Sequence, residues 1–592
     1  MKNKHPKILP MRANFANNDE FSNQIQFEFE GQVLKAFPGD SIAAALIVYD
    51  IIDLRYTSDG ESRGIFCGMG VCQECLVEID GEQNQRACMT KVREGMQIFR
   101  QKYHAKLNLE SAKKIREKSS SDIKVETPDI LVVGGGVGGM SSASIAAECG
   151  MDVVILDERA SLGGQFSKQP TPFHASTLMA KKDPQISLGR RLIKRIENAK
   201  VKVLNDVQVW AGFPERNILA IINGQNVLFK PKRLIIATGA YERPIPIKGW
   251  TLPGVMTTGA AQTLLRTYNV LAGKKIFIVG NGPFNIQVAL ELERAGASIV
   301  GISESAFKPG LNSINSILEM FIGSPKLFFQ GIRYLKELRK NKIPIHYNYY
   351  LSSVKNNGNE LESIISPTSS GKILGKKDIS FNSNIVCMGY GFLPSNILLR
   401  NLGCEFSYDS FRKQLIVVRS ENFETKTSGI YAVGDCAGLG GAYAACEEGI
   451  IAGIKAVFSL DHKIKTKHHD EYSKAVKALK KHRKFQSGFW KLFKSKLPNL
   501  LDTNQETYIC RCEQVTMGHI LKAIESGSMS IGEFKQRTRV GMGRCQGRYC
   551  ASFLSEIIEA KTNVSIDEEK FFAPRFPIFP TKISEINKLQ ED

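Results

Sequence analysis

Apolar and polar residues alternate near the start of the chain in a pattern typical of half-buried strands. Residues 25–29 alternate in this way, and residues 33–37 follow as their hairpin partner. Asp40 or Ser41 is placed to cap a helix over residues 43–51. With a cysteine-rich loop and one further strand, these elements predict a β-grasp ferredoxin-like domain.

Short apolar runs followed by glycine turns recur farther along the chain. Residues 130–133 form the first run and residues 276–279 the second, and each leads through glycines into a helix. A third run at 430–433 leads into Gly434 and Asp435. This order predicts an α/β fold in which one Rossmann-like dinucleotide-binding domain is interrupted by another and then completed.

Four cysteines near the N-terminus have the spacing C-x4-C-x2-C, with the fourth farther on. This spacing suits a loop that wraps a 2Fe-2S cluster, whose last thiolate comes from a more distant segment. Zinc sites prefer paired short spacings, so the cluster is favoured over zinc. Gly64, Gly68 and Gly70 would let thiolates and amides converge on it. The predicted ligands are Cys67, Cys72, Cys75 and Cys88.

A second group of four cysteines lies near the C-terminus with the spacing C-x-C...C-x4-C. It resembles bacterioferritin-associated-ferredoxin-like (BFD-like) 2Fe-2S modules, and zinc stays open as the alternative. A helix that begins near Cys545 would favour the negative charge of the ligands. Arginines beside the ligands would offset that charge; they are Arg511, Arg544 and Arg548. The predicted ligands are Cys510, Cys512, Cys545 and Cys550. The five other cysteines are scattered and are interpreted as core residues.

The first glycine turn has the form G-x-G-x-x-G, with Gly134, Gly136 and Gly139 between an apolar strand and a helix. Such glycines let the backbone approach a pyrophosphate, and the helix N-terminus offers free N–H groups to it. Asp157 ends the next apolar strand, eighteen residues after Gly139, where an acid accepts hydrogen bonds from ribose hydroxyls. Turn, strand and acid together predict a nucleotide site.

The second glycine turn departs from that form. Gly280 and Gly282 are present, but Asn285 stands where a third glycine normally lets helix and strand pack closely. The following strand ends at Glu304, whose carboxylate suits an unphosphorylated ribose and hence NAD rather than NADP. The pattern predicts a site for NAD or another nucleotide, with a structural or vestigial role favoured over catalysis with NAD.

The segments around these turns resemble the two-dinucleotide-domain flavoprotein family. In that family an A-T-G turn follows a strand of the FAD domain, and a late G-D approaches the ribityl chain of FAD. The matching residues here are Gly164, Gln165, Thr238, Gly239, Gly434 and Asp435. The resemblance implies FAD as the first nucleotide. No cysteine occurs between Cys149 and Cys387, where disulfide reductases of this superfamily keep their redox pair, which argues against dithiol chemistry.

The whole chain resembles a fusion of the small iron-sulfur subunit and the large flavin subunit of the amine dehydrogenase family. That family includes hydrogen cyanide synthase, opine oxidases, D-hydroxyproline dehydrogenase and, more distantly, heterotetrameric sarcosine oxidase. The motifs that carry the resemblance are CGMGVCQEC, VVGGGVGGM, LGGQ, GNGPFN, IYAVGDCAG, CRCE and GMGRCQGRYC.

This resemblance implies an electron-transfer subunit with FAD and two 2Fe-2S clusters. A flavoprotein amine oxidase (DAO-like) partner subunit would oxidise a secondary amine, imino acid or glycine-like substrate, such as sarcosine, an opine or D-hydroxyproline. Electrons would then cross into this chain and leave to a quinone or an electron carrier.

The resemblance also sets the expected domain order. In chain order, the predicted units are a 2Fe-2S ferredoxin-like domain (1–104), a linker (105–127), the first part of an FAD-binding domain (128–254), an NAD-binding-like domain (255–375), the second part of the FAD-binding domain (376–460), a basic connector (461–505), and a small, mainly α, BFD-like 2Fe-2S domain with the C-terminal tail (506–592).

Two alternative functions stay open on the sequence. The chain could be a self-sufficient NADH:acceptor oxidoreductase, with NADH held against the flavin by Gly280, Gly282 and Glu304. It could instead be a module whose clusters sense redox state or iron supply. His174 and Tyr241 lie near the flavin motifs. A lone residue of either type is more often packed or hydrogen-bonded than catalytic, so no catalytic residue is assigned.

The net charge of +20 raises the question of nucleic acid, but the excess is uneven. Residues 462–496 hold twelve Lys or Arg against two acids. This connector suits either a partly packed, solvated segment or a basic helix that docks on an acidic partner or an anionic membrane. No recognised nucleic-acid-binding module is present.

The N-terminal segment lacks the apolar stretch of a secretory signal, and no apolar run reaches the roughly 20 residues of a membrane span. We expect a cytoplasmic protein, with peripheral contact at the inner face of the membrane allowed.

Overall fold

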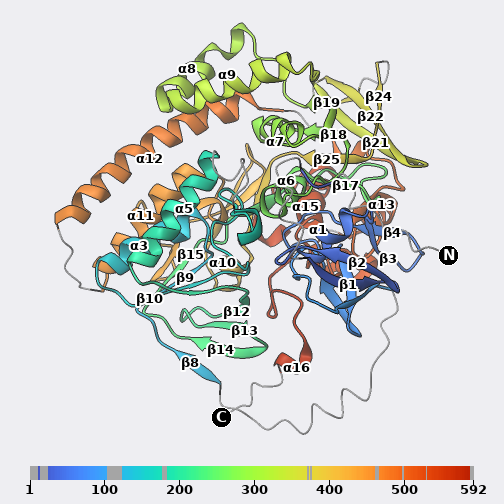
Figure 1. The fold of residues 1–592 in the computed structure, drawn as a ribbon. Helices are drawn as coiled ribbons and strands as arrows, with labels where there is room; N and C mark the ends of the chain where they lie inside the picture. Colours follow the sequence, from blue (N-terminus) through green and yellow to red (C-terminus); the bar gives the residue numbers. More distant parts are fainter. Residues whose placement is uncertain are drawn as a thin grey trace.

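The computed structural model describes most of the chain (Figure 1). The described residues are 11–13, 24–102, 123–175, 183–369, 372–373, 377–460, 466–495, 499–528 and 530–586. Most of the predicted linker at 105–127 therefore lies outside the described residues. Its last part forms a strand, β8 (Lys124–Glu126).

The N-terminal domain is a mixed five-stranded sheet whose core is shared with helix α1 (Ile42–Ile47). The helix begins as predicted, because Ser41 Oγ accepts a hydrogen bond from the Ala44 N–H at 3.2 Å. It ends before residue 51 because Asp50 adopts a left-handed φ of 62°, through which a helix does not continue. In sheet order, the strands are β2 (Gln32–Ala36), β1 (Ile25–Phe29), β7 (Gln97–Arg100), β5 (Leu76–Ile79) and β6 (Glu82–Arg86), with β3 (Asp53–Tyr56) and β4 (Ser62–Gly64) as a separate pair.

The first dinucleotide domain is built on a parallel five-stranded sheet. In sheet order its strands are β11 (Lys202–Leu204), β10 (Val153–Leu156), β9 (Ile130–Val133), β15 (Arg233–Ile236) and β29 (Ile430–Ala432). Helices α3 (Val137–Glu148) and α11 (Ala442–Phe458) pack closely together. A Cβ at Gly449 would lie 2.3 Å from the Gly138 carbonyl oxygen, so glycine is required at this crossing. An attached sheet contains β12 (Gln208–Gly212), β13 (Ile218–Ile222), β14 (Gln225–Phe229) and β8.

The second dinucleotide domain is inserted between β15 and β29, which confirms the predicted nesting. Its parallel sheet contains, in order, β17 (Val255–Thr257), β25 (Ile385–Gly389), β18 (Lys275–Gly280), β19 (Ser298–Glu304) and β20 (Ile345–Tyr347). Its helices are α6 (Thr258–Tyr268), α7 (Pro283–Arg294), α8 (Ile314–Gly323) and α9 (Pro325–Lys340). A further sheet holds β21 (Tyr349–Asn357), β22 (Glu360–Ser369) and β24 (Ile379–Ser383).

The basic connector contains a long helix, α12 (Thr466–Leu492), that packs on α8 and α11. The C-terminal module follows, with strands β30 (Tyr508–Cys510) and β31 (Val515–Thr516) and helices α13 (Met517–Glu525), α14 (Ile531–Thr538) and α15 (Cys550–Thr562). Figure 1 shows α13 and α15 beside the N-terminal domain. One apolar core joins the N-terminal cysteine loop, the second dinucleotide domain and this module. Among the described helices, none has the length and hydrophobicity needed to cross a bilayer.

Candidate functional site

The N-terminal cysteine group occupies a tight loop between β4 and β5. All four predicted ligands are buried free thiols. Gly68 and Gly70 have φ values of 60° and 77°, so the loop needs glycine at both positions. The Cys67 sulfur accepts N–H bonds from Met69 at 3.5 Å and from Cys72 at 3.4 Å. Burial would raise the pKa of Cys67, but the Cys72 thiol and these amides outweigh it and lower the pKa to about 6.

The C-terminal cysteine group is formed by two loops that meet. Cys510 ends β30 and Cys512 lies in the turn before β31. Cys550 begins α15, whereas the sequence predicted a helix start near Cys545. The Cys512 thiol interacts with Cys545 and lowers the pKa of Cys545. A Cβ at Gly543 would lie 2.3 Å from the Cys512 Cβ, so the loops touch. Each set offers four convergent soft sulfur ligands, which fits a 2Fe-2S cluster.

A buried ion-pair network joins the two cysteine groups. Glu74 lies between Cys72 and Cys75 in the sequence, and its carboxylate pairs with Arg511 of the C-terminal loop at 3.6 Å. Arg55 and Arg63 pair with the same carboxylate at 2.9 and 4.0 Å. Burial alone would raise the pKa of Glu74, but the three guanidinium groups lower it below its ordinary value. No motif in the sequence indicated a role for Glu74; the available signal was a lone acid inside a cysteine loop.

The Arg511 guanidinium is also held by two aromatic rings. It lies 3.9 Å from the centroid of Phe66 and 4.7 Å from that of Trp250, and it donates to the Trp250 carbonyl at 2.6 Å. Phe66 precedes Cys67 in the N-terminal loop. Arg511, from the C-terminal ligand loop, therefore contacts Phe66, the residue next to the N-terminal ligand Cys67.

The first glycine turn forms a cradle of close backbone approaches. A Cβ at Gly139 would lie 1.9 Å from the Gly134 carbonyl oxygen, and one at Gly164 would lie 2.8 Å from the Gly136 Cα. Asp157 accepts N–H bonds from Gly135 and Arg159, and burial raises the pKa of its carboxyl to about 6. Because glycine has no side chain at these positions, a pyrophosphate can approach the backbone closely, which fits FAD.

The late G-D segment closes the cradle from the other side. Asp435 Oδ1 accepts N–H bonds from Gly440 at 2.9 Å and Gly441 at 2.8 Å, and the Gly434 N–H donates to Glu448 at 2.9 Å. In the A-T-G turn, Thr238 Oγ1 donates to the Ser395 carbonyl at 2.6 Å. These contacts fix the orientation of both segments toward the cavity.

The second glycine turn is internally bonded. Glu304 accepts N–H bonds from Gly282 and Ala306 and from the Asn281 side chain, and burial raises the pKa of its carboxyl to about 7. Asn281 Nδ2 also donates to the Phe493 carbonyl at 3.0 Å, just after α12. Asn285, in place of the third glycine, donates to the Gly389 carbonyl at 2.8 Å and so links α7 to β25.

One cavity of about 870 Å³ connects these features. Most predicted nucleotide-binding residues line it, whereas Gly139, Gly280 and Glu304 are not among its lining residues. The lining members are Gly134, Gly136, Asp157, Gly164, Gln165, Thr238, Gly239, Gly282, Gly434 and Asp435. Cys67 of the N-terminal group and Arg548 of the C-terminal loop also line it. The structure thus brings Cys67 and the C-terminal ligand loop to the wall of the flavin-type cradle.

Three aromatic rings connect the cavity wall with both cysteine groups. Tyr549 precedes Cys550, and its ring centroid lies 5.7 Å from Phe66 and 5.5 Å from Tyr241. Tyr241 lines the cavity, its hydroxyl donates to the Arg548 carbonyl at 2.8 Å, and burial raises its pKa. Tyr241 therefore lies at the site, whereas His174 is not among the cavity's lining residues and lies 3.8 Å from Asp40.

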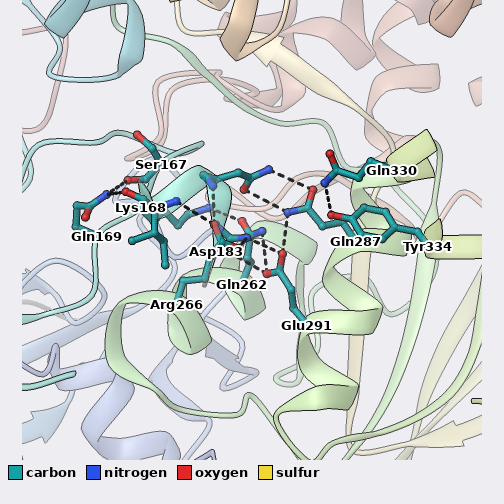
Figure 2. Close-up of polar contacts among 12 residues, drawn as sticks. Ser167, Lys168, Gln169, Asp183, Gln262, Arg266, Gln287, Glu291, Gln330 and Tyr334 are labelled. Atoms are coloured by element: carbon teal, nitrogen blue, oxygen red, sulfur yellow. Dashed lines mark hydrogen bonds and ion pairs between the residues drawn. The ribbon is translucent and has the colours of Figure 1, made fainter. Parts of the chain in front are cut away.

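A buried acid and a buried base also line the cavity, and no pattern in the sequence indicated either of them. Burial lowers the pKa of Lys168 to about 7 and raises that of Glu242 to about 7. Lys168 Nζ donates to Gln262 at 2.8 Å, which begins a polar network through Glu291 and Arg266 of the second domain (Figure 2). The network ties the cavity wall to α6 and α7.

Three family profiles match the chain over separate segments. Residues 128–449 match the pyridine nucleotide-disulphide oxidoreductase family, residues 22–103 a 2Fe-2S iron-sulfur cluster binding domain, and residues 508–560 a BFD-like 2Fe-2S binding domain. The chain belongs to the pyridine nucleotide-disulphide oxidoreductase family, as an FAD-type oxidoreductase that carries two 2Fe-2S binding domains. The match at 508–560 favours the cluster over zinc in the C-terminal group.

Several similar curated proteins are named as subunits of enzymes. The hydrogen cyanide synthase subunit HcnB of Pseudomonas aeruginosa is 30% identical over 78% of this chain and 98% of its own length. An opine oxidase subunit of Agrobacterium tumefaciens is 28% identical over 80% of this chain and 94% of its own length. The subunit HcnA of the same Pseudomonas aeruginosa synthase is 43% identical over 12% of this chain and 65% of its own length. The chain thus resembles two separate subunits of one enzyme, which confirms the resemblance found in the sequence.

A solved structure supports the fold over nearly the whole chain. The L-proline dehydrogenase from P. horikoshii superposes with a TM-score of 0.70 at 19% identity, over 96% of this chain and 98% of that one. This likeness confirms the predicted fold class.

Proposed function

We propose that this chain is the electron-transfer FAD and iron-sulfur subunit of a multi-subunit dehydrogenase or oxidase. The observation that carries the proposal is the shared cavity, which is lined by the flavin-type cradle, by Cys67 and by Arg548. The Tyr241–Tyr549–Phe66 contacts extend from that cavity to both cysteine groups. A chain that moved electrons between three cofactors would need such short, apolar connections.

Each set of residues has a distinct part in this proposal. When bound, FAD and the two clusters supply two-electron and one-electron redox chemistry, respectively. The glycine cradle binds the pyrophosphate of FAD, and Asp157 accepts hydrogen bonds from its ribose. The two cysteine groups hold the iron, and the Glu74 network keeps their loops in contact.

The substrate and the partner are proposed from the relatives. Hydrogen cyanide synthase and opine oxidase subunits support a donor with a C–N bond, an amine or imino acid. We assign its oxidation to a flavoprotein amine oxidase (DAO-like) partner subunit, and we propose a quinone or an electron carrier as the acceptor. The absence of any cysteine between Cys149 and Cys387 speaks against dithiol chemistry.

For the second nucleotide site we propose a structural role, with NAD or another nucleotide as its ligand. Glu304 already accepts three hydrogen bonds, and Asn281 is bonded to Glu304 and to the Phe493 carbonyl. These bonds support a fixed turn over one that rearranges around a reacting dinucleotide.

Anaerobic reduction of the purified chain, alone and with its co-purified partner, tests the proposal. We expect the amine substrate to bleach the flavin and reduce both clusters only when the partner is present. NADH added to the chain alone should leave the flavin oxidised. Rapid flavin bleaching by NADH without a partner would instead support an NADH:acceptor oxidoreductase, and clusters that stay oxidised during turnover would support a sensing module.

A further inference from the structure

Helix α8 turns an apolar face to the solvent. Ile314, Leu318 and Ile322 are 57%, 52% and 49% exposed, and Phe321 beside them is 41% exposed. Leu311, in the turn before the helix, is 85% exposed. A helix at the surface of a soluble domain normally presents polar residues on this side. An apolar patch of this kind marks an interaction surface.

The opposite face of α8 is locked against α12. A Cβ at Gly323 would lie 2.4 Å from the Phe485 backbone nitrogen, and one at Gly488 would lie 2.4 Å from the Ser316 carbonyl oxygen. The two helices therefore touch backbone to backbone, and α8 cannot rotate its apolar face inward. In Figure 1, α8 and α9 form the outer edge of the molecule beyond α12.

Helix α9 extends the apolar face. Phe329 is 58% exposed, and its ring lies 6.0 Å from Phe321 and 5.7 Å from Phe328. Phe307, before α8, is 56% exposed. The α8–α9 hairpin, residues 307–342, thus carries a continuous set of exposed aliphatic and aromatic side chains.

The same hairpin carries an excess of unpaired positive charge. Its two acids are neutralised by bases from outside it, because Glu319 pairs with Lys491 and Glu337 pairs with Arg294, both at 2.6 Å. The hairpin's own bases are all exposed and form no ion pair with any described residue. These bases are Lys308, Lys326, Arg333, Lys336, Arg339, Lys340 and Lys342.

We infer that the α8–α9 hairpin docks on an anionic lipid surface. Exposed apolar residues combined with surrounding cations are the pattern by which interfacial helices enter the headgroup region of anionic membranes. A second copy of this chain would bring its own hairpin cations against the cations of the first copy, and these like charges would repel each other. The charge balance of the hairpin therefore favours lipid over self-association.

Flotation of the full-length holoprotein with vesicles tests this inference. We expect the protein to float with vesicles of phosphatidylcholine mixed with phosphatidylglycerol, to stay behind with phosphatidylcholine alone, and to be released by high salt. Leu318→Glu should lower the bound fraction at least about tenfold, since it removes apolar contact and adds a repelled charge. Lys326→Glu should lower it less, through charge alone.

Matched controls separate the surface from general charge effects. Val33→Glu and Lys230→Glu make the same chemical changes at exposed positions outside the hairpin, and both should bind vesicles like the native chain. Equal binding by Leu318→Glu and the native chain would overturn the inference. Two other results would also overturn it. In the first, light scattering shows a dimer that Leu318→Glu dissociates, while vesicle binding is unchanged. In the second, a co-purified protein partner protects the apolar face from chemical labelling and vesicles do not.

Discussion

Glu74 is the side chain whose removal should separate the two cysteine groups. Glu74→Gln keeps the shape of the residue and removes the only carboxylate of the described residues that Arg55, Arg63 and Arg511 share. All three arginines are buried, so water cannot replace the lost partner. We expect the docking of the C-terminal module on the N-terminal loop to weaken.

The distances from Glu74 to its arginines indicate how strongly its carboxylate holds the C-terminal module on the N-terminal loop. At an effective dielectric constant of about 20, charges 2.9 and 3.6 Å apart attract by about 6 and about 5 kcal/mol before desolvation. Arg511, from the C-terminal loop, is therefore attracted to Glu74 almost as strongly as Arg55 from the same domain. Breaking a buried network of this kind costs about 3–5 kcal/mol net.

Trp250 is suited to report this loss. It is 1% exposed, its indole N–H donates to the Tyr508 carbonyl at 2.9 Å, and the Arg511 guanidinium lies over its ring. With Trp210 and Trp490 replaced by Phe in every variant, urea unfolding followed by fluorescence measures the docking of the C-terminal module. Glu74→Gln should lower the free energy of that transition by about 3–5 kcal/mol.

Glu506→Gln provides the matched control. Glu506, also of the C-terminal module, pairs at 2.8 Å with Lys248 of the first dinucleotide domain, but both side chains are exposed. Surface pairs contribute little, so this variant should unfold like the reference. A Glu74→Gln transition that coincides with that of Glu506→Gln would refute the claim that the buried network joins the two groups.

Three further predictions concern the cofactor sites. Cys72→Ser should lower the iron content by about half and leave FAD bound. Cys404 is a buried cysteine outside both groups, so Cys404→Ser should keep all the iron. Unchanged iron content in Cys72→Ser would contradict the ligand assignment. Gly139→Ala should reduce the FAD content, because its Cβ would meet a carbonyl oxygen at 1.9 Å, while Gly532→Ala, whose Cβ would meet nothing closer than 3.9 Å, should bind FAD normally. Burial raises the pKa of Glu304 in the folded state from 4.5 to about 7, so the stability that its protonated form contributes is fully present below pH 4.5, and about 3 kcal/mol of it is lost by pH 7. Glu304→Gln should therefore show a smaller decline in the free energy of unfolding between pH 4.5 and pH 7. A pH profile parallel to that of the native chain would count against this prediction.

Local patterns predicted the elements that depend on near neighbours. The helix cap was predicted as Asp40 or Ser41, because such side chains accept hydrogen bonds from amides a few residues away, and Ser41 takes this role. The nesting of the two Rossmann-like domains followed from the order of the glycine turns. The end of α1 could not be predicted, because nothing in the composition of residues 43–51 marks Asp50 as left-handed.

Features that depend on distant segments escaped the sequence analysis. Arg55 and Arg63 lie 19 and 11 residues before Glu74, and Arg511 lies hundreds of residues after it, so its role needed the fold. The apolar residues of α8 have the periodicity of a buried helix, and only the packing of Gly323 on α12 reveals which face points outward. Lys168 stands alone in a polar segment, and its burial comes from the second domain.

The balance of buried charge gives an argument for metal ligation that does not depend on cysteine spacing. Among the residues that the structure describes, Arg55, Arg63 and Arg511 are buried around a single buried carboxylate, and the partly exposed Glu61 is the only second acid, paired with Arg63. Buried charges in proteins are compensated, because an isolated one is too costly to remove from water. The two cysteine groups are a further source of negative charge beside this network, because their loops carry Glu74 and Arg511. Thiolates held by a metal would supply that charge, whereas neutral thiols would leave the arginines in excess. The network therefore fits a protein whose two cysteine groups are both loaded, and it makes the loss of one metal site destabilising for the other.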